Sequence, residues 1–76
     1  MDRITQLTTA HPWLSDHAAH LLLVAYYKRF TDNGARGNML QFLMDDITDS
    51  FSRQSRDEIV ESMQMIMDSY NQQNRS

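Results

Sequence analysis

Three histidines near the N-terminus are the residues best suited to metal chemistry. His17 and His20 lie three positions apart, so a helix places both on one face, with Asp16 beside them. The spacing differs from H-E-x-x-H, in which two histidines four positions apart bind zinc and the glutamate acts as a base. We therefore interpret His11, His17 and His20 as ordinary, partly exposed histidines. If they act at all, their titration at about pH 6–7 would couple association to acidity.

A second group that could do chemistry is acidic: Asp45, Asp46 and Asp49. These aspartates could form a site for a hard cation or a pair of catalytic carboxylates. They lack the spacing and the glycine of an EF-hand loop, and no apolar pocket is predicted that would raise a carboxylate pKa for acid catalysis. We interpret them as a solvated helix face. The sequence also has no glycine-rich phosphate loop, G-x-S-x-G motif or Cys/His pair, so we expect no enzyme, no metal and no cofactor.

The length of the chain limits what can hold it together. With 76 residues it forms one domain, and a single core of this size rarely supplies more than about 3–5 kcal/mol of net stability. Because cysteine is absent, disulfides and cysteine-ligated zinc cannot supplement the core. A second copy of the chain is therefore the favoured supplement. The lack of cysteine, and an apolar run at Leu21 to Val24 far shorter than the roughly 20 residues of a membrane span, predict a cytoplasmic protein.

Turn and capping residues predict three helices, over residues 13–31, 39–51 and 56–70. Pro12 and Ser15 suit a helix start, and Asn33-Gly34 suits a helix end. Asn38 with Gln41, and Ser55 with Glu58, have the spacing of capping boxes. Residues 1–11 are either a tether or one short helical turn, and residues 71–76 form a frayed tail.

The apolar residues fall on helical stripes, which predicts an all-α fold: a helical hairpin crossed by a third helix, with two chains sharing a core. The first helix has a wide apolar arc that includes Leu14, Leu21 and Leu22 on one stripe and Ala19 and Leu23 on another. Such an arc is typical of a central or shared helix. Methionine is also frequent, with six residues, and suits either an irregular core or a partner surface that must re-pack. On the third predicted helix, one apolar stripe is expected to face inward: Ile59, Val60, Met63, Ile66, Met67 and Tyr70. The candidate subunit or partner contacts are Leu22, Tyr26, Met63, Ile66, Met67 and Tyr70.

A small basic group near the first turn, Lys28, Arg29 and Arg36, is the candidate nucleic-acid contact. Scattered surface cations are the favoured explanation, and weak phosphate contact is the alternative. The second predicted helix carries aspartates where a groove-reading helix would carry Arg, Lys, Asn or Gln, and the net charge is −3. DNA binding is therefore disfavoured by the charge of the chain.

From Asn38 to Met67 the order of features resembles the YmgB/AriR family of small bacterial biofilm-development and acid-resistance regulators. The residues that carry the resemblance are Asp32, Asn33, Asn38, Met39, Leu40, Leu43, Met44, Ile47, Asp57, Ile59, Met63, Met65, Ile66 and Met67. The resemblance implies an all-helical homodimer that acts as a small regulator through protein contacts and through DNA. It brings no catalytic residues.

Three functional hypotheses follow. The first is a non-enzymatic regulator, a homodimer that binds another protein in a stress or biofilm pathway. The second is a weak DNA-binding regulator that uses the basic group. The third is an inhibitor encoded by a phage or mobile element, which binds a host protein through an acidic or Met-rich helix.

Overall fold

The computed structural model describes residues 2–73, and within them the chain folds into four α-helices and no strand. Their bounds are α1 Arg3–Ala10, α2 Asp16–Asp32, α3 Gly37–Arg53 and α4 Arg56–Gln73. The all-α class is confirmed. The structure adds one helix, α1, to the three that were expected. It lies in residues 1–11, for which the sequence allowed either a tether or one short helical turn.

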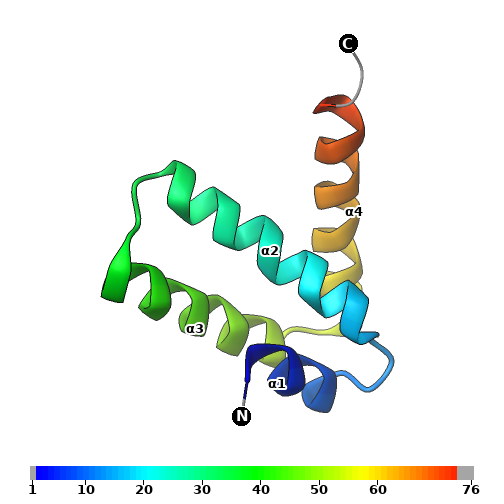
Figure 1. Ribbon diagram of the computed structural model, residues 1–76. Helices are drawn as coiled ribbons and strands as arrows, with labels where there is room; N and C mark the ends of the chain where they lie inside the picture. Colours follow the sequence, from blue (N-terminus) through cyan, green and yellow to red (C-terminus); the bar gives the residue numbers. More distant parts are fainter. Residues whose placement is uncertain (1, 74–76) are drawn as a thin grey trace.

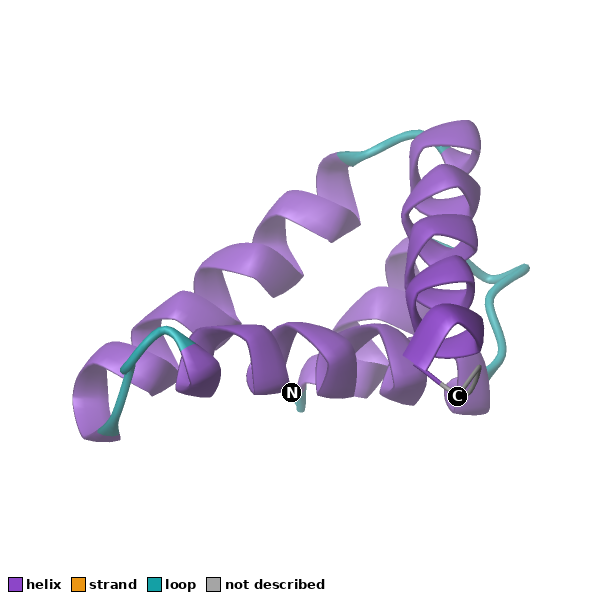
Figure 2. Ribbon diagram, turned by 90° about the horizontal axis from the view of Figure 1, so that it is seen from above, coloured by secondary structure: helices purple, strands orange, loops and turns teal. Residues whose placement is uncertain are grey.

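The α2–α3 hairpin is the centre of the fold. Gly34 has φ +95°, and the backbone N–H of Asn33 donates to the carbonyl of Arg29 at 3.1 Å, so the chain leaves α2 where the sequence predicted. Helix α1 packs against both members of the hairpin. Helix α4 lies at the end of the hairpin remote from the α2–α3 connection and rises away from α1 and α3 (Figure 1). The view from above shows the same placement of α4 (Figure 2).

The helix starts match the capping signals in two of three cases. The Ser15 hydroxyl accepts from the Ala18 N–H at 3.1 Å, which starts α2. At the start of α4 the Ser55 hydroxyl accepts from the Glu58 N–H at 3.3 Å, and the Glu58 carboxylate accepts from the Ser55 N–H at 3.2 Å, which confirms that capping box.

The cap predicted at Asn38 is wrong, because α3 begins at Gly37, two residues before the predicted start at residue 39. Gly37, with φ +56°, turns the chain into the helix, and Arg36 precedes it without a side-chain cap. The frayed tail is wrong for residues 71–73, which continue α4. Residues 74–76 lie outside the described part of the chain.

The core forms where α1, α2 and α3 meet, with one contribution from α4. Its buried apolar residues are Leu7, Leu14, Ala19, Leu22, Leu23, Ala35, Leu40, Met44, Phe51 and Ile59. Leu21 was expected to point inward but is exposed. Helices α1 and α3 both pack against α2. The buried arc of α2 therefore includes Ala19 and Leu23, and Leu21 lies outside this arc.

One histidine has a structural role that the sequence does not predict. His11, expected to be partly exposed, is buried, and its Nε2 lies 2.8 Å from the carbonyl oxygen of Phe51. Because a carbonyl only accepts hydrogen bonds, Nε2 carries the proton. This bond ties the α1–α2 connection to the C-terminal end of α3.

Candidate interaction surface

An apolar row runs along α4 on the boundary between its packed face and solvent. It consists of Val60, Met63, Met67 and Tyr70, which we call the α4 stripe. Met67 is 59% exposed and Tyr70 is 64% exposed, while Met63 is half-buried against the core. Spacings of three and four residues put these side chains on one side of a helix. The stripe is an apolar surface that its own protomer leaves uncovered.

Helix α4 exposes this row because only the part of the helix up to Ile66 is anchored. Ile59 is fully buried, and Met63 and Ile66 pack against the edge of the core. Ile59 is the one buried residue of α4 as described, and α2 is the main helix on which α4 packs. Beyond Ile66 the helix continues to Gln73 away from the hairpin, and all seven residues from Met67 to Gln73 are exposed (Figure 1). The capping box therefore starts a helix that is longer than the surface available to cover it.

The six predicted contact residues separate into three groups by exposure. Leu22 is 1% exposed and belongs to the protomer's own core, so it cannot contact a partner in this fold; this part of the prediction is wrong. Tyr26 is half-buried, with its ring 5.2 Å from that of Phe51. Met63 and Ile66 are half-buried on α4, and Met67 and Tyr70 are the exposed members.

The contact prediction omitted Val60. Its apolar periodicity predicts that Val60 faces the core, but the structure leaves it 46% exposed. Its spacing of three, seven and ten residues from Met63, Met67 and Tyr70 is the signal that groups it with them.

The basic group does not form a free cationic patch. Lys28 makes an ion pair with Asp32 at 3.2 Å, and the Arg29 guanidinium lies over the Tyr26 ring at 5.0 Å. Arg36 is exposed at the start of α3. Phosphate binding depends on several cations acting together, and two of the three are already engaged within the chain. The structure thus gives DNA binding little support.

The aspartates of α3 are not only a solvated face. Arg3 of α1 donates to the carboxylate of Asp45 at 2.8 Å and to the side-chain carbonyl of Gln41 at 2.7 Å. Gln6 donates to the carboxylate of Asp49. Two of the three aspartates therefore hold α1 in place, and Gln41, expected in a capping box, serves the same contact.

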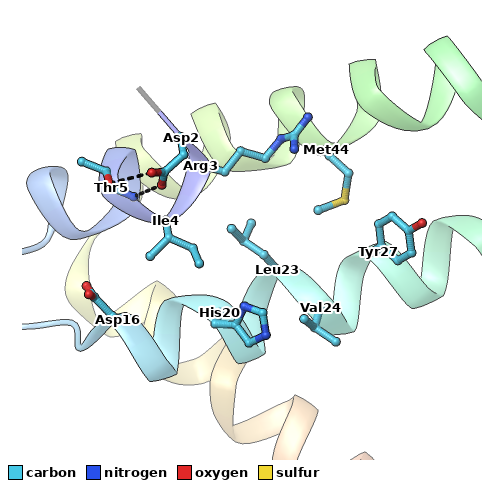
Figure 3. A pocket seen from close by; sticks show the side chains of 10 residues that line it. All are labelled: Asp2, Arg3, Ile4, Thr5, Asp16, His20, Leu23, Val24, Tyr27 and Met44. Atoms are coloured by element: carbon cyan, nitrogen blue, oxygen red, sulfur yellow. Dashed lines mark hydrogen bonds between the residues drawn. The ribbon is translucent and has the colours of Figure 1, made fainter.

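An open hollow of about 480 Å³ lies between the N-terminal part of α1 and helices α2 and α3 (Figure 3). Its apolar walls include Ile4, Leu23, Val24 and Met44, and its polar groups include Asp16 and His20. Within residues 2–73 no three His, Cys, Asp or Glu side chains are grouped so as to hold a metal ion. Among the described residues, His20 and the Asp16 carboxylate therefore have no third His, Cys, Asp or Glu side chain grouped with them to bind a metal ion.

Asp2 at the rim of this hollow is used as a helix cap. Its carboxylate accepts from the backbone N–H of Thr5 at 2.8 Å and from the Thr5 hydroxyl at 3.1 Å. These bonds, the backbone bond above all, stabilise the charged form and lower the pKa of Asp2 below its ordinary value.

No protein-family model matches this chain, and no curated protein and no solved structure matches it significantly. In the part of the chain that is described, no helix is both long and apolar enough to span a bilayer.

Proposed function

We propose that this chain is a small non-enzymatic regulator that works as a homodimer and binds another protein. The observation that carries the proposal is the α4 stripe, an apolar row on a helix that rises clear of its own hairpin. Chains of this length seldom reach adequate stability from one core, and burying a Met or Tyr side chain contributes about 1.5–3 kcal/mol. A second copy is the partner always present at the concentration of the chain itself.

The test is a charge placed on the stripe, with a matched charge placed off it. Met67→Glu puts a carboxylate into the proposed contact, where burial without a partner is costly, so the dimer should dissociate at micromolar concentration. Met65→Glu is the control, since Met65 is equally exposed on α4 but lies on the other side of the helix. Sedimentation velocity over a range of concentrations measures the oligomeric state of both variants. A wild-type chain that stays monomeric at high micromolar concentration would contradict the proposal.

The regulatory half of the proposal needs a separate measurement. Tagged wild-type protein and Met65→Glu should retain the same host protein at a defined stoichiometry, and the isolated pair should bind with a measurable Kd. If the chain dimerises but retains no host protein at a defined stoichiometry, self-association stands and the proposed regulatory role is contradicted. The pathway we assign, biofilm or acid-stress signalling in the bacterial cytoplasm, is supported by the resemblance to YmgB/AriR regulators over Asn38 to Met67.

A further inference from the structure

We infer that two copies of the chain pair through α4 in antiparallel orientation, with the two-fold axis at the level of Met65. This inference rests on the proposed homodimer and adds its geometry. An isologous dimer requires a surface that is complementary to itself when rotated by two-fold symmetry. The α4 stripe meets that requirement in its spacing.

The spacing of the stripe is the same read in either direction. Its intervals are three, four and three residues, so Val60 and Tyr70 lie five residues on either side of Met65, and Met63 and Met67 lie two. An antiparallel partner therefore places its Tyr70 opposite Val60 and its Met67 opposite Met63. The smallest side chain of the row then faces the largest, and the two flexible methionines face each other, which suits close packing. A parallel pair would instead set Tyr70 against Tyr70 and Val60 against Val60.

The charges of α4 favour the same orientation. Asp57, Glu58 and Glu61 lie with Arg56 in the first turns of the helix, whereas Asp68 is the single charged residue from 65 to 73. A parallel pair would gather six carboxylates at one end, together with the like ends of two helix dipoles. An antiparallel pair places each acidic end beside the less charged half of its partner, in which Asp68 is the one carboxylate from 65 to 73, and opposes the two dipoles.

The arrangement of the protomer fits as well. The hairpin and α1 lie at the N-terminal end of α4, and the C-terminal part of α4 rises away from them (Figure 1). Antiparallel pairing puts the two hairpins at opposite ends of the helix pair. The exposed Tyr70 of each copy then lies near the end of α4 that emerges from the other copy's core.

Because the chain has no cysteine, single-cysteine variants test the orientation directly. A disulfide forms only when the two Cα atoms are about 4.4–6.8 Å apart, so the pairing must bring the two positions together. We expect V60C alone and Y70C alone to form little disulfide-linked dimer under mild oxidation. The double variant V60C/Y70C should convert at least fivefold more of its chains to linked dimers, and mass spectrometry of peptides should find the bond joining residue 60 to residue 70. M65C, on the far side of the helix from the stripe, is the control and should remain unlinked.

Sedimentation of the same samples under reducing conditions separates this inference from the proposed function. A monomeric wild-type chain refutes both. A dimer in which V60C links to itself overturns the antiparallel orientation and leaves the homodimer standing. A dimer with no link at either position shows that another surface holds it. If V60C/Y70C does not dimerise when reduced, M63C/M67C replaces it. A bond joining residue 63 of one copy to residue 67 of the other, in a disulfide-linked dimer, supports the inference. A 63–67 bond found only within single chains, or no bond, overturns it.

Discussion

The helices α1 and α4 flank the same hairpin but are held by different physical means. Helix α1 has 8 residues, buries Leu7 completely and is tied to α3 by Arg3 with Asp45. Helix α4 has 18 residues, buries Ile59 completely and leaves the far end exposed. The shorter helix is thus embedded in the fold, and the longer one is formed by local signals and held at one end. Length and capping determine that a helix forms, whereas tertiary contacts determine how much of it the protomer covers.

The largest expected difference between the two helices comes from truncating one apolar side chain in each. Leu7→Ala leaves a cavity between α1 and the hairpin and should lower the free energy of unfolding by about 2–5 kcal/mol. For a domain of this size that loss is sufficient to abolish cooperative folding. Met65→Ala on α4 removes an exposed side chain and should change the free energy by less than about 0.5 kcal/mol. Urea denaturation followed by circular dichroism at one protein concentration measures both. Equal effects would show that α1 is not embedded as described.

The sequence was informative about where helices form. Asn33-Gly34 and the Ser55–Glu58 pair correctly located the end of α2 and the start of α4, because these residues bond to their own backbone within a few positions. The start of α1 has a signal of the same kind, since Asp2 is a good N-cap residue and accepts from the Thr5 N–H. With Ile4 and Leu7 as its main apolar groups, α1 lacked the periodicity that identified the longer helices.

The sequence could not decide which part of each apolar arc is covered. Adjacent stripes on one helix have the same spacing, and only the partners of the helix select between them. Leu22 was assigned to a partner and lies in the core, while Val60 was assigned to the core and is exposed. His11 was misjudged for the same reason, since its hydrogen-bond acceptor, the Phe51 carbonyl, lies forty residues away in the chain.

A smaller effect should follow from removing the local signal that starts α4. Ser55→Ala deletes the hydroxyl that accepts from the Glu58 N–H and should cost about 0.5–2 kcal/mol. Ser69→Ala is the matched control in the same helix, because it makes the same chemical change away from the cap. Hydrogen exchange of α4 amides should accelerate in Ser55→Ala and should not accelerate in Ser69→Ala, since alanine is the better helix former within the helix. If the two variants exchange alike, the tertiary contacts of Ile59 rather than the cap hold this helix start.

The smallest effect concerns the cap of α1 and depends on pH. The backbone N–H of Thr5 lowers the pKa of Asp2 in the folded chain, so the cap contributes stability above the unfolded pKa, which is about 3.9, and loses it as the pH falls through the folded pKa. The Leu7 methyl signals in NMR spectra should therefore shift below about pH 4, before those of Ile59.

The control for this prediction must separate Asp2 from the two other carboxylates that contact α1, those of Asp45 and Asp49. Asp2→Asn retains a capping oxygen but does not titrate, so the difference between wild type and this variant isolates the cap. Identical pH profiles for the two proteins would assign the acid sensitivity of α1 to its contacts with α3. In that case α1 would depend on tertiary contacts alone, and its contrast with the self-capped α4 would be sharper still.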